Sequence, residues 1–327
     1  MNDQIIQGVS AAVLTAILLT IWKLKGIYDV PSHRSAHSKA IPTAAGICIA
    51  FVFLIFFGVG QIDIIDYDSP PLTLVAGLTI LTIVGFIDDW KEVNYKTRLL
   101  SHIVAVGLVL TQQKLNIPEY AIWFFIGVGL INACNFLDGL NGLLASQWLL
   151  TIGFILSAFA PENSFFWILW ISTLVYLFYN FPKAVVFIGD TGSTILGFSY
   201  FCMLFSLAPI QNQFPSFIIN HDSFIIFCLF PLGFAWADVA FTILRRFAEK
   251  RSMVWSFGDY GFHYKAKFLD SHALVTLIYL SLNCLLTFAA ALIFSNHQLI
   301  YPLCCIYALG QIVHWAVIYR LSRMNLE

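Results

Sequence analysis

Four short polar segments carry the side chains that could do chemistry in this chain, and one of them contains two adjacent carboxylates. Asp88 and Asp89 end a long apolar run, and Glu92 lies on the face of Asp88 if the helix continues. Carboxylates at a membrane boundary are costly unless a cation pairs with them. Mg²⁺ prefers oxygen ligands and is usually held by one or two carboxylates together with substrate phosphates. The pair therefore favours metal-assisted phosphate chemistry, with a solvated helix end as the alternative.

A second segment combines an amide, a carboxylate and two glycines. Asn135 and Asp138 are three residues apart and could point into one cavity, while Gly139 and Gly142 let a ligand or another helix approach closely. The alternative is a helix start at which Asp138 caps the first turn.

The third segment, residues 187–193, joins two apolar runs and is expected to open a helix. Backbone N–H groups at a helix start favour anions, and the hydroxyls of Thr191 and Ser193 add donors. Asp190 is a further hard metal ligand, and Phe187 offers a flat face on which a base can stack. A Gly-Asp-x-Gly-Ser motif alone is weak evidence, but the longer run is much more specific.

A basic loop follows the first apolar run. It contains Arg34, His37 and Lys39, whose side chains can donate hydrogen bonds to phosphate oxygens. Pro31, Pro42 and other turn residues indicate a shaped loop rather than a helix. An ordinary basic loop on the inner side of a membrane is the alternative.

A larger loop, residues 245–272, contains His263, Lys265 and Lys267. Lysine is a point charge that holds phosphate throughout the working pH range, whereas histidine is charged only below about pH 6.5. We predict that these side chains hold phosphate. The alternative is that both lysines only follow the charge rule for inner loops. Just before this loop, Asp238 is expected to pair with Arg245 along one helix face, with a substrate contact as the alternative.

Apolar runs must position these segments. Of the 327 residues, 59% are hydrophobic and 11% are charged, which is too little charge for a soluble surface. About 20 apolar residues in a helix cross a bilayer core of roughly 30 Å. The sequence therefore predicts an all-α integral membrane protein, a single domain over residues 1–327 with about eleven transmembrane helices, or ten because two runs are short. The runs are 4–22, 43–60, 71–87, 99–112, 120–134, 140–160, 164–180, 192–209, 223–244, 273–294 and 298–319.

The basic residues divide the loops between two sides. With the N-terminus outside, sixteen of the 17 Lys and Arg residues fall in inner loops and only Lys114 falls outside. The positive-inside rule therefore predicts a chain whose N-terminus is outside and whose C-terminus is cytoplasmic. On this topology every polar segment described above lies on the cytoplasmic side, where one site can face cytosolic and bilayer substrates together.

Taken together, the segments resemble the polyprenyl-phosphate N-acetylhexosamine-1-phosphate transferases. This family includes the enzymes that start O-antigen and enterobacterial common antigen synthesis, and phospho-N-acetylmuramoyl-pentapeptide transferase. The resemblance spans roughly residues 27–270 in four blocks. These blocks are the first loop with its Arg-x-x-His and Pro, Asp88-Asp89-x-x-Glu92, Asn135-x-x-Asp138-Gly139, and Phe187-x-Gly189-Asp190-x-Gly192-Ser193.

The resemblance implies roles for individual residues. Asp190 would ligate Mg²⁺, with Mn²⁺ as an alternative, and Phe187 would stack on uracil. Catalytic positions are expected at Asp88, Asp89 and Asp138. Substrate contacts are expected from Arg34, His37, Lys39, Asn135, His263, Lys265 and Lys267.

The same resemblance implies transfer of a sugar 1-phosphate from a UDP-N-acetylhexosamine to undecaprenyl phosphate at the cytoplasmic face of a bacterial inner membrane. This would be the first membrane step in making O-antigen or another envelope polysaccharide. The bilayer and the two substrates are the expected partners. No nucleic acid is expected, and the oligomeric state stays open, a homodimer being one option. The alternatives are a membrane transporter and a non-catalytic protein that binds lipid-linked sugars. The sugar itself cannot be identified from the residues.

Two departures from the family pattern bear on the site. Asn141 stands where the family usually has a second Asp, so a possible contact is neutral here. The large loop normally carries clustered histidines that are thought to hold the diphosphate, and here only His263 remains, with Lys265 and Lys267 close by.

Overall fold

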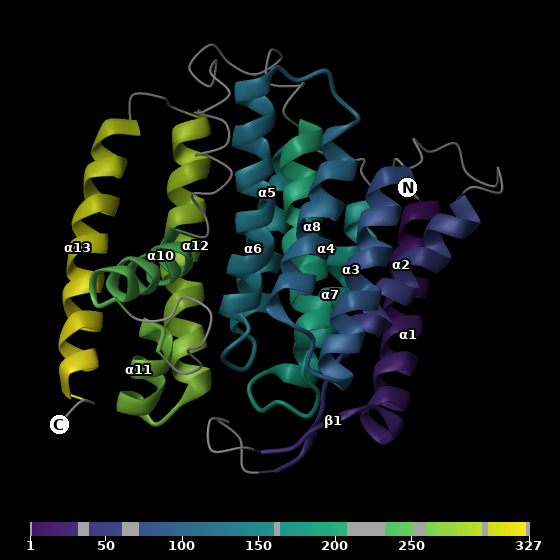
Figure 1. Cartoon of the computed structure of the whole chain (residues 1–327), viewed down its shortest axis with the longest axis horizontal. Coiled ribbons are helices and arrows are strands. Elements are labelled where there is room, and N and C mark those ends of the chain that lie inside the picture. The colour runs from purple at the N-terminus through teal and green to yellow at the C-terminus, as the bar shows by residue number, and fades with distance from the viewer. Residues whose placement is uncertain are drawn as a thin grey trace. The chain divides into compact units, whose positions relative to one another are not determined.

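The computed structural model describes residues 2–31, 39–60, 72–159, 164–207, 233–250, 259–295 and 300–324. A helix lies over each of the eleven predicted apolar runs, so the prediction of a helical chain is confirmed (Figure 1). The large loop holds an additional short helix, α11, that the sequence analysis did not predict. The described helices are α1 (Asn2–Lys25), α2 (Gly46–Gly60), α3 (Leu72–Trp90), α4 (Tyr95–Leu110), α5 (Ile117–Leu137), α6 (Leu143–Phe159), α7 (Ser164–Asn180), α8 (Gly189–Leu207), α10 (Gly233–Ala248), α11 (Gly261–Leu269), α12 (His272–Ser295) and α13 (Ile300–Met324).

Several of these helices have the length and composition of membrane spans. Among the described residues, four helices are long and apolar enough to cross a bilayer: α1 over Ile5–Lys25, then α3, α5 and α12. Shorter apolar helices cover Gly46–Phe57, Leu143–Phe159 and Phe165–Asn180. The number of crossings and their direction stay predictions.

Helix α1 has one exposed face and one buried face. Val9, Val13 and Ile17 repeat every four residues and are exposed, as expected for a stripe that faces lipid. The opposite face is buried and packs on α7, and there Thr15 donates a hydrogen bond to Ser172 at 3.1 Å. A polar pair inside an apolar interface therefore fixes how these two helices meet.

The chain divides into two compact units. The first comprises Met1–Asp138 and Leu156–Ser206, and the second comprises Gly139–Ile155 and Leu207–Glu327. In the first unit, α3 packs on α4, α4 on α5, and α1 on α2 and α7. A two-stranded antiparallel hairpin, β1 (Tyr28–Asp29) and β2 (Ile41–Pro42), closes the end of α1 (Figure 1).

In the second unit, α10 packs on α12 and α13, and the short α11 packs on the same two helices. A buried polar contact holds this unit together, because Asn283 donates to Gln147 at 2.6 Å while its own Oδ1 accepts from the backbone N–H of Phe234. Asp270 is the C-terminal cap of α11 and adopts the left-handed conformation with a φ of 48°.

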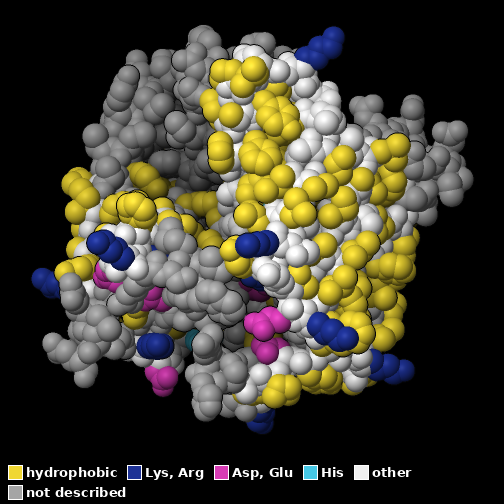
Figure 2. Space-filling model, in the orientation of Figure 1, with side chains coloured by type: hydrophobic (Ala, Val, Ile, Leu, Met, Phe, Trp, Pro, Cys, Tyr) yellow, Lys and Arg dark blue, Asp and Glu magenta, His cyan; other side chains and the backbone are white. Residues whose placement is uncertain are grey.

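The surface of the first unit reflects the same sorting of residue types. Figure 2 shows apolar side chains along the length of its helices on the face in view, with charged side chains gathered mainly toward the end at which β1 lies in Figure 1. This distribution is typical of a bundle whose sides face lipid and whose one end faces water.

Candidate active site

The start of α8 is built around Asp89. This carboxylate accepts hydrogen bonds from the backbone N–H groups of Asp190 and Thr191, at 2.8 and 3.0 Å, and from the Thr191 hydroxyl. A carboxylate that caps a helix start satisfies donors that have no partner within the helix and interacts favourably with the helix dipole. Gly189 has a φ of 71°, and a Cβ there would clash with the Asp89 carboxylate. Glycine is therefore required at this position.

Glycines also let neighbouring helices clamp the α8 backbone. A Cβ on Gly85 of α3 would lie 2.6 Å from the Thr191 Cα, and a Cβ on Gly46 of α2 would overlap the backbone of Gly192. The first turn of α8, which carries Asp190, is therefore fixed in place by backbone contact with two other helices.

Asp88 points to a different partner from its neighbour. One terminal nitrogen of Arg98, Nη1, donates to Asp88 Oδ2 at 2.9 Å and to Asp190 Oδ2 at 2.5 Å. The other oxygen of Asp88 accepts from the backbone N–H of Val93 at 2.6 Å. Burial lowers the pKa of Arg98, but the charges of Asp190 and Asp88 outweigh this effect and raise it above its usual value. The guanidinium therefore stays charged between these two carboxylates.

Asn135 and Asp138 of the second segment both lie near Asp190. Asn135 Nδ2 donates to Asp190 Oδ1 at 2.8 Å and to the Ser193 hydroxyl at 3.0 Å. Asp138 ends α5 as its C-terminal cap, so the alternative reading of Asp138 as an N-terminal cap is wrong. Burial, together with the negative charges of Asp190 and Asp89, raises the pKa of Asp138 well above its ordinary value.

The first loop packs against the start of this helix. Phe187 donates its backbone N–H to Pro42 at 2.7 Å and accepts from Ala45 at 3.0 Å, and its side chain is half-buried. Lys39 is exposed. The predicted phosphate ligands Arg34 and His37 lie outside the described residues.

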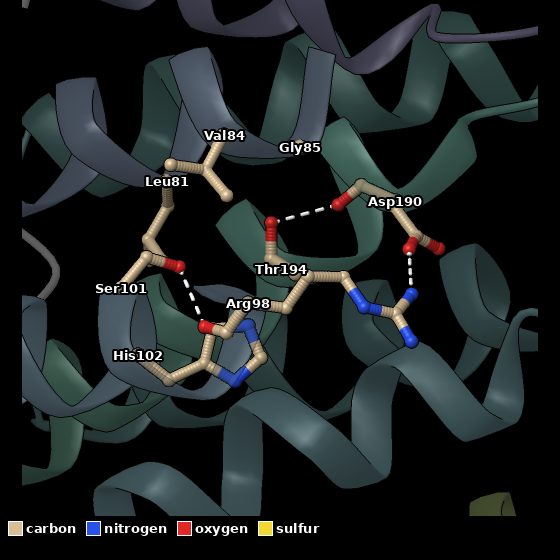
Figure 3. A pocket seen from close by; sticks show the side chains of 8 residues that line it. All are labelled: Leu81, Val84, Gly85, Arg98, Ser101, His102, Asp190 and Thr194. Atoms are coloured by element: carbon tan, nitrogen blue, oxygen red, sulfur yellow. Dashed lines mark hydrogen bonds and ion pairs between the residues drawn. The ribbon is translucent and has the colours of Figure 1, made fainter. Parts of the chain in front are cut away.

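A small pocket lies directly beside the Arg98–Asp190 pair (Figure 3). Its cavity volume is about 10 Å³, roughly what one water molecule needs. Thr194 donates to the backbone carbonyl of Asp190 at 2.7 Å, and Ser101 donates to the carbonyl of Arg98 at 2.7 Å. Buried His102 completes the polar wall, and its Nδ1 has no hydrogen-bond partner among the described residues. Leu81, Val84 and Gly85 form the apolar wall.

Lys265 of the second unit has partners inside that unit. Its Nζ donates to Tyr279 Oη at 2.7 Å, and the Tyr279 hydroxyl donates in turn to Asp238 Oδ2. Burial lowers the pKa of Lys265 to about 8, although the charge of Asp238 opposes this effect. A phosphate contact by Lys265 would therefore weaken above pH 8, which corrects the expectation of a constant charge across the working range. Lys267 is exposed.

Asp238 does not make the predicted ion pair with Arg245. The Asp238 carboxylate accepts from the backbone N–H of Gly261 at 2.7 Å and from Tyr279, whereas Arg245 pairs with Asp259. Sequence spacing missed this arrangement because Gly261 and Tyr279 reach Asp238 only through packing of α11 and α12 on α10.

His263 lies within the second unit against Gly139, where an added Cβ would come within 2.7 Å of its Nε2. Burial and the nearby positive charges of His272 and Lys267 lower the pKa of His263 to about 4. The ring is therefore neutral at pH 7 and could contact phosphate only as a neutral donor. Phosphate binding by His263, Lys265 and Lys267 stays a prediction.

The donor set near Asp190 bears on the metal that the sequence predicts. No group of three or more His, Cys, Asp and Glu side chains in the described part of the chain is arranged to hold a metal ion. Two hard oxygens, Asp88 Oδ2 and Asp190 Oδ2, nevertheless converge on a single cationic nitrogen of Arg98. Mg²⁺ commonly takes one or two protein carboxylates and completes its shell with substrate phosphates and waters. These residues therefore fit a metal whose remaining ligands are substrate phosphates and waters.

Arg98 is the site residue that the sequence analysis missed. It was counted among the inner-loop basic residues, and its only distinguishing signal was its position ten residues after Asp88, across a short turn between two apolar runs. Its contact with Asp190, 92 residues away, depends entirely on how α4 packs against α3 and α8.

Comparison with the sequences of known proteins places this chain in a family. Residues 71–208 match the model of glycosyl transferase family 4. The chain is also 30% identical over 271 residues to the probable undecaprenyl-phosphate N-acetylglucosaminyl 1-phosphate transferase of Bacillus subtilis (strain 168), covering 76% of this chain and 72% of that protein. The chain belongs to glycosyl transferase family 4. This confirms the family that its motifs resemble.

Two other relatives of this glycosyl transferase family 4 chain are also polyprenyl-phosphate transferases by name. It is 27% identical over 248 residues to undecaprenyl-phosphate alpha-N-acetylglucosaminyl 1-phosphate transferase of Thermotoga maritima, covering 73% of this chain and 72% of that protein. It is 28% identical over 313 residues to decaprenyl-phosphate N-acetylglucosaminephosphotransferase of Mycobacterium leprae, covering 81% and 77%. With bacterial relatives and several apolar helices of spanning length, the chain is a multi-pass membrane protein.

The family match and the site coincide along the chain. Residues 71–208 include α3, α4, α5 and α8. These four helices carry or end at the residues of the Asp190 cluster, namely Asp88, Asp89, Arg98, Asn135, Asp138 and Asp190. The matched region therefore contains the carboxylates, the amide and the arginine that lie together at one end of the first unit.

Proposed function

We propose that this glycosyl transferase family 4 protein transfers an N-acetylhexosamine 1-phosphate from a UDP-sugar to undecaprenyl phosphate, releasing UMP. The observation that carries the proposal is the convergence of Asp88, Asn135 and Asp190 at one helix start, inside the region that matches the family. The names of the relatives support both a polyprenyl phosphate acceptor and an N-acetylglucosaminyl donor. UDP-N-acetylglucosamine is therefore the first donor to test.

The reaction needs alignment and charge neutralisation more than covalent catalysis. A non-bridging oxygen of the lipid phosphate forms a bond to the β-phosphorus of the UDP-sugar. The bond from that phosphorus to the oxygen shared with the α-phosphorus breaks, and UMP leaves with the electron pair on this oxygen. The lipid phosphate is already largely ionised at neutral pH, since the second pKa of a phosphate monoester is about 6. A protein base therefore contributes modestly.

The carboxylates divide the work according to their contacts. Asp190 and Asp88, whose oxygens converge, are the proposed metal ligands, and Mg²⁺ when bound supplies charge neutralisation for the diphosphate and for departing UMP. Asn135 orients Asp190 by donating to its second oxygen. Asp89 is engaged by three donors at the start of α8, so its role is to position Asp190.

Asp138 is the carboxyl best suited to carry a proton. Its raised pKa lets it hold a proton at a pH at which an ordinary carboxyl would not. In the fraction of molecules in which Asp138 is ionised, it would take the remaining proton from lipid phosphate that enters protonated. The half-buried Phe187 ring, held by the first loop, is the proposed platform for uracil.

The proposed site lies on the cytoplasmic side of a bacterial inner membrane. The Lys and Arg distribution supports this orientation, because all polar segments of the site share the side that carries sixteen of 17 basic residues. This side gives access both to a water-soluble nucleotide sugar and to the phosphate of a lipid.

A donor screen tests the function. Purified protein in lipid nanodiscs, supplied with undecaprenyl phosphate and Mg²⁺, is offered UDP-N-acetylglucosamine, UDP-N-acetylgalactosamine and a UDP-6-deoxy-N-acetylhexosamine, and both UMP and the lipid product are measured. We expect equal amounts of the two products from at least one donor, and none when undecaprenyl phosphate or Mg²⁺ is omitted. UDP-sugar binding without release of UMP from any donor would instead favour a non-catalytic binding protein.

A further inference from the structure

Arg98 occupies the point at which the two proposed metal ligands converge. A single nitrogen, Nη1, lies within hydrogen-bonding distance of both Asp88 Oδ2 and Asp190 Oδ2. Arginine usually meets a carboxylate with two parallel N–H donors. Here one donor atom is shared between two carboxylates, so the guanidinium acts as a bridging cation.

The two carboxylates are held independently of Arg98. Asp190 stands on the first turn of α8, which Gly85 and Asp89 fix through backbone contact and capping, and it also accepts from Asn135. Asp88 accepts from the backbone N–H of Val93. The oxygens can therefore keep their places when the guanidinium leaves.

Arg98 is the most accessible member of the trio. Its side chain is 37% exposed, compared with 7% for Asp88 and 28% for Asp190. It also stands in the first turn of α4, next to a connecting segment, where a long side chain can swing toward water. Of the three side chains, it is the one that can move without disturbing the helix packing.

In the absence of metal, the positive charge of Arg98 offsets the negative charge of the carboxylates around it. Asp88, Asp89 and Asp190 all lie at this end of the first unit, and ionised carboxylates this close repel one another unless a cation is present. A guanidinium does not lose its proton at any physiological pH. A competing cation can therefore release it from these two oxygens without any change in the protonation of the arginine.

We propose that Arg98 is the built-in counter-cation of the metal site and that a divalent cation exchanges with its guanidinium at Asp88 and Asp190. In the metal-free protein, Arg98 balances the negative charge of the two carboxylates. When the metal binds, the guanidinium leaves these oxygens. The proposal rests on the metal site of the proposed function, but its test needs neither donor nor acceptor.

Mn²⁺ binding to the purified protein, stripped of metal and held in nanodiscs, gives the first measurement. Electron paramagnetic resonance of free Mn²⁺ reports the affinity. We expect Arg98→Ala to bind Mn²⁺ at least 10-fold more tightly than wild type, because no guanidinium must be displaced. Lys96→Gln is the matched control, since it removes a nearby exposed positive charge from the same helix turn, and its affinity should stay within threefold of wild type.

Methylguanidinium separates occupation of the site from a general effect of charge. In Arg98→Ala it should raise the metal-free thermal midpoint and weaken Mn²⁺ binding competitively, whereas in wild type it should do neither. If Arg98→Ala yields no folded protein, Arg98→Lys replaces it, and the proposal then requires at least threefold tighter binding of Mn²⁺, because an ammonium cannot reproduce the guanidinium contacts.

Unchanged or weaker Mn²⁺ binding in the variant, or failure of methylguanidinium to compete, would overturn the exchange. A wild type that binds no Mn²⁺ at millimolar concentration would overturn it as well. A wild type that binds Mn²⁺ but transfers no sugar phosphate would contradict the proposed function alone, so the two failures can be told apart.

Discussion

The adjacent carboxylates of Asp88 and Asp89 contact different partners, because neighbouring side chains on a helix point about 100° apart. Asp89 faces the start of α8 and caps it, whereas Asp88 faces Arg98. Asp190 contacts both of these residues: its backbone N–H donates to Asp89 and its carboxylate accepts from Arg98. The Asp190 carboxylate also accepts a hydrogen bond from Asn135. These contacts are the reason for which Asp190 is proposed as a metal ligand.

Replacing Asp190 with Asn should abolish transfer while the protein still inserts normally. The amide keeps the shape of the side chain but loses the charge that a hard cation requires. We expect UMP release at limiting Mg²⁺ to fall by at least 10³-fold. Comparable expression and thermal midpoint are the control for folding. Transfer within tenfold of wild type by a correctly inserted variant would remove Asp190 from the metal site.

Lys265 should make stability depend on pH in a defined direction. Its pKa in the folded protein is about 8, compared with 10.5 for an ordinary lysine. Between these values the unfolded chain binds more protons than the folded one, so stability rises with pH. From pH 7 to 9.5, wild type should therefore gain roughly 1 kcal/mol relative to Lys265→Met, after allowing for solvent screening.

Thermal midpoints of wild type and Lys265→Met, measured in parallel across this pH range, check that expectation. Lys267→Met is the matched control, because Lys267 is exposed and two residues away on the same short helix. Its difference from wild type should stay flat. A flat or falling difference for Lys265→Met would show that Lys265 is not buried in solution as it is in this structure.

At the scale of elements, the start of α8 is a junction. Three glycines allow it: Gly46 and Gly85 bring α2 and α3 against its backbone, and Gly189 leaves room for the Asp89 carboxylate. The hairpin strand β2 leads into the same junction, because Phe187 donates its backbone N–H to Pro42. The proposed metal ligand Asp190, the cap Asp89 and the first loop therefore all depend on one packed contact.

Gly46→Ala should damage this junction, because the added methyl group would overlap the backbone of Gly192. Overpacking of this kind costs typically 1–3 kcal/mol, occasionally more. We expect a lower thermal midpoint or a loss of folded protein. Gly129→Ala is the control, since a Cβ at Gly129 meets nothing within 4 Å, and it should be neutral or gain up to about 1 kcal/mol. Equal effects of the two substitutions would contradict the clamp.

At the scale of the whole molecule, membrane orientation decides which substrates can reach the site. The chain should have its N-terminus outside and its C-terminus in the cytoplasm, because sixteen of 17 basic residues then lie inside. Reporter fusions after Glu327 should report cytoplasm, and fusions near Asp66 should report the outer side. A C-terminus outside the cytoplasm would remove one crossing and contradict the predicted arrangement of the polar segments on one side.

The two compact units differ in what they contribute. The first holds the whole Asp190 cluster and the pocket beside Arg98, while the second holds the buried chain from Lys265 through Tyr279 to Asp238. The family match spans parts of both units, yet the residues that form the cluster all belong to the first.

Much about this protein was determined by sequence alone. Apolar runs long enough to cross a bilayer predicted every helix from α1 to α8 and then α10, α12 and α13. The thickness of the bilayer sets the length of such a run, and the backbone inside lipid must form its own hydrogen bonds, so a helix follows from local sequence. The motifs around Asp88, Asn135 and Asp190 identified the family, because metal and phosphate chemistry restricts the residue types that can serve. Helix α11 was not predicted, since a short amphipathic helix leaves little signal in a polar loop.

Only the tertiary structure decided which side chain meets which. Asp89 caps a helix that begins 100 residues later, Arg98 bridges to Asp190 across 92 residues, and Lys265 turns toward Tyr279. None of these pairings leaves a local pattern, because each depends on how close two helices approach. That approach depends in turn on small residues such as Gly85. The sequence alone does not show that a side chain at Gly85 would clash with the backbone of Thr191.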